Sequence, residues 1–518
     1  MGGRMSNDPG NEEETGRASS YRIKALLSVI LVLAAGLRLY GVEKECPWYD
    51  EITSLRYLQA SNPIQYALSV QAENPVSTPV YFQLEYFWAC IFGPSVPLLR
   101  VVSVVLGTAG IFVVYLLAAR LFSPLAGLLA ALFLALNGFH RYYSMELRPY
   151  ILVLALAGLS GYAFLLAIET RKKRFWAASL ACNLLMVWTH VFSGLFFLPQ
   201  GLILLGRLRH HRLWFVLWGM ANGFFLLTAL LWIKLLDRGA IFAAASWMPK
   251  PSLLGFDGQS ALGFYAACAG EQNAAQHPPG WSLAGPALWV LVFLALVAGV
   301  IALWRAPKPA GADTCLGPRE KLLFLLVWLL APPTILFVLS YLWVPCFVYR
   351  YLFYCLLPFW ILVGGGLAAV RNLWFRASGV LTLCVLMCVQ ALPILGVPQR
   401  PDWQTPARLI QQCAGNGTPV LAVGFADTYC LRYFLGSRFQ VEQSESVSDM
   451  ADRAASLTLD HAMVFALLRD NWTNEDRARF ESALTARKAG YQTTCIPSAR
   501  TMYLYRFSGK PAQGQSGP

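Results

Sequence analysis

Residues 25–42 read ALLSVILVLAAGLRLYGV, and residues 46–51, soon after them, read CPWYDE. The first stretch is long enough to cross the hydrocarbon core of a bilayer as a helix. Arg22 and Lys24 precede it, and basic residues favour the cytoplasmic side of a span. We therefore expect the amino terminus in the cytoplasm and the acidic pair Asp50 and Glu51 at the outer end of the span.

The composition of the whole chain also indicates a membrane protein. The chain has 518 residues, of which 57% are hydrophobic and 13% are charged. Soluble globular domains carry roughly twice that share of charged residues, about 25%. Apolar runs of about 20 residues recur along the chain, which is the length that a membrane helix needs. We predict an α-helical polytopic membrane protein with about 11 transmembrane helices.

The net charge of +13 raises the question of a nucleic-acid partner. The basic residues instead form short clusters between apolar runs, such as RKKR at 171–174. Such clusters mark cytoplasmic loops that face anionic lipid headgroups. We expect membrane lipids as partners and no nucleic acid.

The hydropathy falls sharply near residue 399, and this change sets the domain organisation. An odd number of spans places the C-terminal residues of this multi-pass protein outside. The predicted parts are a disordered cytoplasmic tail (1–20), a transmembrane bundle (21–398) with a first outer loop (43–97), a small soluble periplasmic α/β domain (399–508) and a disordered tail (509–518). Within the α/β domain, strands are predicted at 418–424, 462–468 and 502–507, and helices at 405–412 and 474–489.

Charged residues gather in the loops that this count places on the outer side. Asp50 and Glu51 lie in the first loop, Glu146 and Arg148 in the second, and Arg350 in the fourth. Carboxylates can take a proton from a hydroxyl group, and arginine binds phosphate with two parallel hydrogen bonds. If these loops converge, they form a pocket with carboxylates on one side and guanidinium groups on the other.

Each of these features also has a purely structural interpretation. The pair Trp48-Tyr49 beside solvated acids is typical of a membrane-interface belt. Arg148 and Arg350 can extend to lipid phosphates, and His190 can be a hydrogen-bonded histidine inside the bundle. The glycine run 364–366 lies within an apolar span, where close helix packing explains it better than a phosphate loop does. A nucleotide-sugar donor is therefore not supported.

Several short motifs occur along the chain in a definite order. They are WYDE at 48–51, NP at 74–75, TPVYF at 78–82, YYSMELRPY at 142–150, TH at 189–190, WMP at 247–249, YRY at 349–351 and PDW at 401–403. In these motifs the chain resembles the C-type glycosyltransferase superfamily, which has the GT-C fold. The resemblance is to the bacterial branch of glycosyltransferase family 39, related to protein O-mannosyltransferases and aminoarabinose transferases. It implies a multi-pass protein of the bacterial plasma (inner) membrane. The chain departs from the family at 77–79 (STP, often His-Pro-Pro) and at Met145 (often Gln).

The resemblance implies transfer of a sugar from a polyprenyl-phosphate-linked donor to an acceptor hydroxyl on the extracytoplasmic face. It makes Asp50 the general base of an inverting single displacement, with Glu51 positioning the base or the acceptor. Glu146 would be a second acid near the reacting sugar. Arg148 and Arg350 would hold the departing lipid phosphate.

Aromatic side chains are expected around the cavity, and the acceptor is a glycan, a lipid or a protein. The cavity residues implied are Tyr49, Tyr81, Tyr150, His190 and Tyr351. No cofactor is expected. Some members of the wider superfamily use a divalent metal, but no metal site is expected in this branch.

Two other functions are compatible with a polytopic membrane protein. One is a transporter or flippase of a polyprenyl-linked glycan, and the other is a catalytically inactive scaffold whose C-terminal domain binds partners. Transporters place functional charges near the bilayer midplane and often consist of two related halves. Here the charges lie at the ends of spans, which favours the glycosyltransferase.

Overall fold

The computed structural model describes residues 9–73, 77–234, 239, 245, 248–254, 260–270, 284–307, 315–395, 400–469, 475–487, 490–496 and 502–508. The chain divides into two compact units. The bundle unit comprises Met1–Tyr40 and Tyr57–Ala391, and the tail unit comprises Gly41–Arg56 and Leu392–Pro518. The predicted outer loop 43–97 is thus divided between the units, and its acidic part belongs to the tail unit.

Some predicted features fall at or beyond the limits of the described residues. The motif residues Asn74, Pro75 and Trp247 lie outside them, as do residues 1–8 and 509–518 of the two predicted tails. Residues 9–20 were predicted to be disordered, but they form the first turns of helix α1 (Pro9–Leu39). Once a helix is nucleated by its apolar part, each added residue gains a hydrogen bond, so the helix extends into the polar segment.

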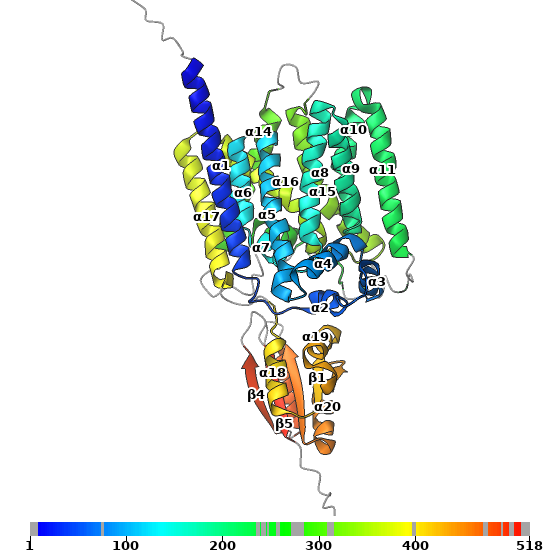
Figure 1. Ribbon diagram of the computed structural model, residues 1–518. Helices are drawn as coiled ribbons and strands as arrows, with labels where there is room; N and C mark the ends of the chain where they lie inside the picture. The colour runs from blue at the N-terminus through cyan, green and yellow to red at the C-terminus, as the bar shows by residue number, and fades with distance from the viewer. Residues whose placement is uncertain are drawn as a thin grey trace, which may run out of the picture. The chain divides into compact units, whose positions relative to one another are not determined.

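The named elements of the bundle unit are all helical, and an isolated β-bridge joins Ser252 to Ser260 (Figure 1). After α1, its elements are α3 (Pro63–Glu73), α4 (Pro79–Phe92), α5 (Val96–Leu121), α6 (Pro124–Leu136), α7 (Gly138–Tyr143), α8 (Tyr150–Thr170), α9 (Lys173–Val187), η1 (Val191–Phe196), α10 (Phe197–Gly206), α11 (Leu208–Lys234), α13 (Ala261–Ala269), α14 (Ala284–Arg305), α15 (Pro318–Leu342), η3 (Tyr349–Cys355), α16 (Leu356–Ala369) and α17 (Leu373–Leu395), whose last residues belong to the tail unit.

Seven of the described helices are long and apolar enough to cross a membrane. They lie at Val96–Leu121, Tyr150–Thr170, Leu208–Ile233, Gly285–Arg305, Pro318–Leu342, Tyr349–Ala369 and Leu373–Leu392. The apolar stretches Pro124–Leu136 and Val191–Gly206 are shorter. The polytopic helical fold is confirmed, whereas the count of about 11 spans stays a prediction.

The apolar windows of these helices differ greatly in burial. The apolar window of α8 is 83% buried, and the window that spans η3 and α16 is 89% buried. These helices therefore form the centre of the bundle. The windows of α11 and α17 are only 22% and 17% buried. An apolar surface of this extent requires hydrocarbon around it, as in a bilayer.

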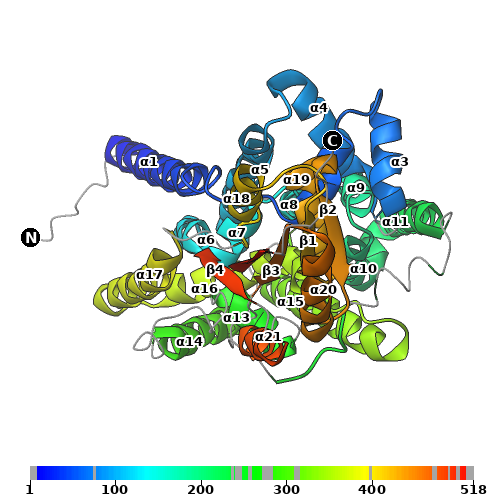
Figure 2. The same cartoon turned by 90° about the horizontal axis from the view of Figure 1, so that it is seen from below.

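The glycine run 364–366 allows α16 to pack closely, as the sequence indicated. Helix α16 lies between α6 and α14 (Figure 2). A Cβ atom added at Gly364 would lie 2.7 Å from the carbonyl oxygen of Ala126, which is closer than real Cβ atoms approach. Backbones that pack this closely are typical of membrane helices, which associate through small residues.

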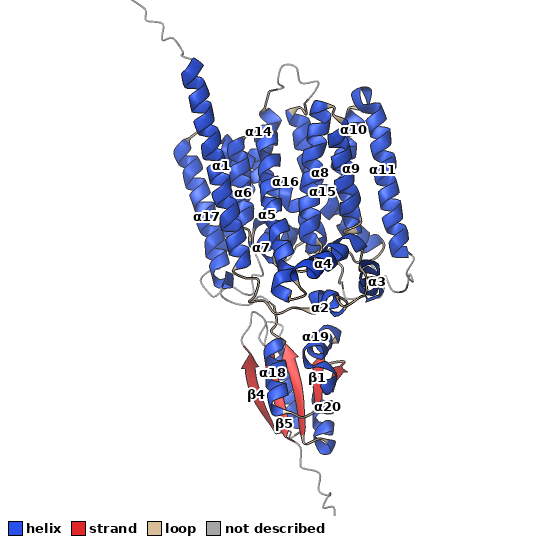
Figure 3. Ribbon diagram, viewed as in Figure 1, coloured by secondary structure: helices blue, strands red, loops and turns tan. Residues whose placement is uncertain are grey.

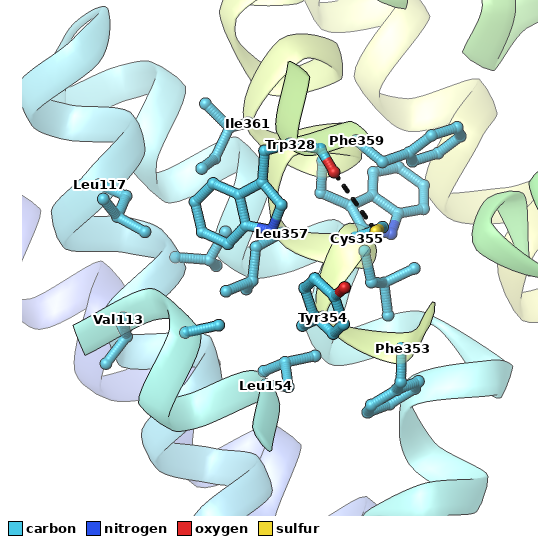
Figure 4. Packing of buried hydrophobic residues seen from close by; sticks show 14 of the residues in the cluster. Val113, Leu117, Leu154, Trp328, Phe353, Tyr354, Cys355, Leu357, Phe359 and Ile361 are labelled. Carbon is cyan, nitrogen blue, oxygen red and sulfur yellow. Dashed lines mark hydrogen bonds between the residues drawn. The ribbon is translucent and has the colours of Figure 1, made fainter. Parts of the chain in front are cut away.

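Large apolar side chains fill the space around the centre of the bundle. Figure 4 shows Trp328 beside residues of α5, α8, η3 and α16. The thiol of Cys355 donates a hydrogen bond to the carbonyl oxygen of Trp328, with an S···O distance of 3.3 Å. Tyr354 is fully buried in the same cluster. This core holds the start of η3, which carries Arg350, against the central helix α8.

A buried polar network joins helices α8, α9, α10 and α11. Asn183 donates hydrogen bonds to the side-chain oxygens of Gln200 and Asn222, both at 2.9 Å. It accepts one from Ser160 at 2.6 Å, and Gln200 donates to Ser160 at 2.9 Å. Side chains of this kind hydrogen-bond across membrane helices and fix their mutual rotation.

The tail unit contains a five-stranded sheet in the order β2-β1-β3-β5-β4. Figure 3 shows the strands of this unit in red. The strands are β1 (Pro419–Val423), β2 (Gln440–Ser444), β3 (Met463–Arg469), β4 (Tyr491–Ile496) and β5 (Met502–Ser508), and the helical elements are α2 (Tyr49–Arg56), α18 (Gln404–Cys413), α19 (Phe425–Leu435), η4 (Gly436–Arg438), α20 (Val447–Asp460) and α21 (Glu475–Ala486). Strand β1 is parallel to β2 and β3, and β5 is antiparallel to β3 and β4. The three predicted strands coincide with β1, β3 and β5, and the two predicted helices with α18 and α21; residues 474, 488 and 489 lie outside the described ones.

The two faces of this sheet pack into two separate apolar cores, because successive strand residues point to opposite sides. On β1, Val420 packs into one core and Leu421 into the other. The core around Val420 also contains Cys46, Ile52 and Trp403. The segment that precedes and includes α2 is therefore an integral part of the tail unit, although more than 300 residues separate it from the sheet in sequence.

Candidate functional site

The loop that carries Glu146 and Arg148 is firmly held in the bundle unit. Ser103 of α5 donates a hydrogen bond to the backbone oxygen of Glu146 at 2.6 Å, and the Arg148 amide donates to the same oxygen at 2.9 Å. Gly107 of α5 has no Cβ, and one added there would clash with the Ser144 side chain. Glu146 and Arg148 are both buried. Their charges are therefore fixed by the fold.

Aromatic rings surround Arg350 at the start of η3. Its guanidinium carbon lies 5.9 Å from the ring centroid of Tyr150 and 5.8 Å from that of Tyr351. These separations lie within the range of cation–π attraction. The His190 ring lies 4.7 Å from Tyr351 and 5.9 Å from Tyr150. Four predicted site residues from three parts of the chain thus lie together.

The charge of Arg148 also acts on this cluster, through His190. Burial lowers the pKa of His190 to about 3, and the positive charges of Arg350 and Arg148 contribute to this shift. Burial raises the pKa of Tyr143 well above its usual value, Glu146 raises it further, and Arg350 opposes the shift. His190 is therefore neutral at ordinary pH, and the two arginines supply the positive charge of the site. A positive, partly aromatic site of this kind suits an anion such as a phosphate.

The acidic pair belongs to the tail unit. Asp50 and Glu51 lie in the first turn of α2, where negative charge is favourable. Both side chains are buried. This burial does not match the interpretation of solvated charges in an interface belt.

Glu51 forms an ion pair with Arg400, which precedes α18. The Tyr49 ring packs edge-on against Phe425 and Tyr429 of α19, with centroid distances of 5.6 and 5.0 Å. Tyr49 was predicted to line the cavity, and the structure shows it packed on α19. Helix α2 is thus fixed by one ionic and several aromatic contacts.

The predicted site residues therefore fall into three groups. Glu146, Arg148, Tyr150, His190, Arg350 and Tyr351 form one electrostatically connected cluster in the bundle unit. Tyr81 lies on α4, fully buried with its ring 5.7 Å from that of Phe82. Tyr49, Asp50 and Glu51 lie in the tail unit. That Asp50 faces the arginines stays a prediction.

Two residues of these environments were not singled out from the sequence. Tyr143 lies directly before the Glu146 loop, within the motif YYSMELRPY. Arg400 lies directly before the motif PDW at 401–403, so its position beside that motif was the available signal. Among the residues that the structure describes, no three His, Cys, Asp or Glu side chains come together as a metal-binding group.

Comparison with known proteins gives one sequence match and several structural matches. A family model described as dolichyl-phosphate-mannose-protein mannosyltransferase matches residues 75–233. No curated protein matches this sequence. The matched segment contains the Glu146 loop, Tyr150 and His190.

The structural matches extend over nearly the whole chain. ArnT from Cupriavidus metallidurans bound to undecaprenyl phosphate matches with a TM-score of 0.55 and 13% identity, covering 92% of this chain and 97% of that one. The Archaeoglobus fulgidus oligosaccharyltransferase tethered with an acceptor peptide matches with a TM-score of 0.52 and 13% identity, covering 91% and 73%. AglB from the same organism, in complex with an inhibitory peptide and a dolichol-phosphate, matches with a TM-score of 0.52 and 12% identity, covering 94% and 74%.

The described fold is that of a polytopic membrane protein with a small α/β domain. This fold is similar to those of ArnT and of the Archaeoglobus fulgidus oligosaccharyltransferase. In sequence, residues 75–233, which are less than half of the chain, match the model of the dolichyl-phosphate-mannose-protein mannosyltransferase family. Assignment to a bacterial branch stays a prediction.

Proposed function

We propose that the chain is a membrane glycosyltransferase that moves a sugar from a polyprenyl-phosphate-linked donor to an acceptor hydroxyl on the extracytoplasmic face. The observation that carries the proposal is the clustering of Arg350, His190 and Tyr351 in the bundle unit, where the charge of Arg148 also acts on His190. The C-type fold supports it. So do the undecaprenyl phosphate of the ArnT structure and the dolichol-phosphate of the AglB structure.

In this proposal the two arginines bind the phosphate of the donor. Negative charge on that phosphate grows as the glycosidic bond breaks, and fixed guanidinium groups stabilise it most in the transition state. The rings of Tyr150 and Tyr351 keep Arg350 in place and exclude water around it. Glu146 is a second acid near the reacting sugar. A donor anchored in the membrane can reach such a site within the bilayer.

Asp50 is the proposed general base. Its carboxylate takes the proton of the acceptor hydroxyl while the hydroxyl oxygen attacks the anomeric carbon. The bond from that carbon to the phosphate oxygen breaks, and its electron pair leaves with the polyprenyl phosphate. One displacement inverts the anomeric configuration. Hydroxyl groups of a glycan, a lipid or a protein all meet this requirement.

The deciding experiment compares Asp50→Asn with the parent protein in membranes supplied with polyprenyl-phosphate-linked hexose and pentose donors. Release of polyprenyl phosphate should fall by about 10²-fold or more, because the amide cannot accept the proton. The matched control is Asp452→Asn, an exposed aspartate of α20, which should keep parental activity. Parental activity in a well-folded Asp50→Asn protein would remove the general-base role.

The same membranes distinguish the transporter from the transferase. A flippase moves the lipid-linked sugar across the bilayer without releasing polyprenyl phosphate, so intact donor crossing at a parental rate in Asp50→Asn would favour transport. The orientation is tested separately by a reporter fused after Phe507. We expect this reporter outside and one inserted at 171–174 inside. A cytoplasmic reporter after Phe507 would contradict the proposed topology.

A further inference from the structure

Arg400 holds the acidic segment at two points. Its backbone amide donates a hydrogen bond to the Glu45 carboxylate at 3.1 Å. Its guanidinium group forms the ion pair with Glu51. The two side chains of that pair are only 3% and 0% exposed, so solvent hardly screens their charges. One residue thus fixes both the approach to α2 and its first turn.

Apolar contacts around the ion pair leave α2 little freedom to shift. Cys46 and Ile52 belong to the same apolar core as Trp403, three residues after Arg400. At the far end of the helix, the guanidinium carbon of Arg56 lies 5.1 Å from the ring centroid of Tyr429. A buried ion pair contributes little net stability, but removing one partner leaves an uncompensated charge and is strongly unfavourable. The pair therefore specifies where α2 lies.

Helix geometry separates the two acids of the motif. Adjacent helical positions point about 100° apart, so the side chains of Asp50 and Glu51 leave the helix in different directions. The Glu51 carboxylate is engaged by Arg400 and buried. An acid neutralised in this way is poorly suited to contact an acceptor, whereas its neighbour is presented in another direction.

We propose that Arg400 is a positioning residue that anchors α2 through Glu51 and thereby sets the orientation of the Asp50 carboxylate toward the acceptor hydroxyl. This inference rests on the proposed function, in which Asp50 is the base. It gives Glu51 the role of an anchor. The roles of the two adjacent acids then differ.

The test uses the full-length chain with Arg400→Met, Arg400→Lys and the control Arg453→Met. Misplacement of a catalytic group by about 1 Å can cost about 100-fold in rate, so kcat should fall by about this factor in Arg400→Met. The donor KM should stay at the parental value, because the proposed phosphate ligands lie in the bundle unit. Lysine keeps the charge but not the planar fork, so Arg400→Lys should recover part of kcat, about tenfold.

The control replaces another arginine of the same unit that pairs with a glutamate. Arg453 of α20 pairs with Glu442 of β2, and both are partly exposed. Arg453→Met should keep the parental kcat. A parental kcat in folded Arg400→Met would overturn the proposal, and so would an equal loss in both variants.

A second measurement separates this inference from the proposed function. Amide hydrogen exchange over residues 49–56 should be faster in Arg400→Met than in the parent and in Arg453→Met, because α2 loses its anchor. If the parent transfers no sugar from any polyprenyl-phosphate donor, the proposed function fails, while the exchange rates still decide whether Arg400 anchors α2. Unchanged exchange would overturn the anchoring.

Should Arg400→Met fail to fold, the paired variant Glu51→Gln with Arg400→Gln carries the test. Two amides can still hydrogen-bond, and no uncompensated buried charge remains. A kcat lowered tenfold or more at unchanged donor KM would support the proposal, on the order expected for a loosened catalytic group. A parental kcat would overturn it.

Discussion

The Nη2 atom of Arg38 lies 2.7 Å from Nδ1 of His140, and both side chains are fully buried. Arginine has no acceptor atom, so Nδ1 must accept the hydrogen bond and the imidazole proton resides on Nε2. The Nη1 atom of Arg38 also donates to the carbonyl oxygens of Ala34 and Ala135, at 2.9 and 3.2 Å. Arg38 thus joins the end of α1 to the end of α6 and to α7, which leads into the Glu146 loop.

The first prediction concerns this buried contact. Arg38→Met should lower the free energy of unfolding by about 1–3 kcal/mol, because it leaves the His140 nitrogen and the Ala135 carbonyl oxygen without their donor. Thermal unfolding in detergent measures the change. Arg371→Met, which replaces an exposed arginine between α16 and α17, is the matched control. Equal stability of the two variants would contradict the structural importance of the contact.

The second prediction concerns the pH dependence of stability. Burial lowers the pKa of His140 well below its usual value, and the Arg38 charge lowers it further. The unfolded chain binds a proton near pH 6.5, whereas the folded chain binds it only at lower pH, so stability rises with pH over this range. The contribution is complete above about pH 6.5 and is lost as the pH falls below that value.

The melting temperature of the parent should therefore fall between pH 7.5 and pH 5, and His140→Gln should reduce this fall. Glutamine can still accept the hydrogen bond from Arg38 but does not titrate. His210→Gln serves as the control, because it removes an exposed histidine near the start of α11 and leaves the buried His140 in place. Identical pH profiles for the parent and His140→Gln would show that His140 does not titrate as argued.

The third prediction concerns donor binding. Arg148→Met and Arg350→Met should each weaken binding of polyprenyl phosphate by about 10- to 100-fold, the loss expected for a charge-assisted hydrogen bond of about 1.5–3 kcal/mol. Binding can be measured by thermal shift against added polyprenyl phosphate. The control is Arg120→Met. Arg120 lies in the last turn of α5 and pairs with Glu169. Unchanged affinity in both site variants would show that these arginines do not bind the donor phosphate.

The fourth prediction concerns the polar network of the bundle. Asn183→Leu should destabilise the protein by about 1–3 kcal/mol, because Gln200 and Asn222 lose their shared partner within the membrane. Leu185→Ala is the control on the same helix, since that side chain is 43% exposed. Unfolding in increasing denaturant would compare the two. A loss in Asn183→Leu no larger than that of the control would show that the network contributes little.

The tail unit illustrates how far the sequence alone could predict the fold. The three predicted strands are β1, β3 and β5, which lie in the middle of the sheet and are apolar on both faces. The strands that were not predicted, β2 and β4, are the two edges. Their sequences QVEQS and YQTTCI are largely polar, since an edge strand is only half covered. Hydropathy therefore detects central strands and misses edges.

For the candidate site too, the sequence predicted some features and missed others. Motif order predicted that Arg148, Arg350 and His190 belong to one site. In the structure Arg350 and His190 both lie beside the rings of Tyr150 and Tyr351, and a common site stays a prediction. The motif WYDE predicted Asp50 and Glu51 as a pair with related roles. Their separate environments became visible only when α2 was seen packed on α19, with Arg400 against Glu51.

The sequence by itself determined that this chain forms apolar helices and a small α/β domain, because hydrocarbon and backbone hydrogen bonding admit few alternatives for such runs. It also determined the types of charged residue in each loop. Only the tertiary structure decided which of these charges meet. The partner of Glu51 lies 349 residues away, and that of His140 lies 102 residues away. Pairings of this kind leave no local signal, since they depend on how separate elements pack rather than on the residues beside them.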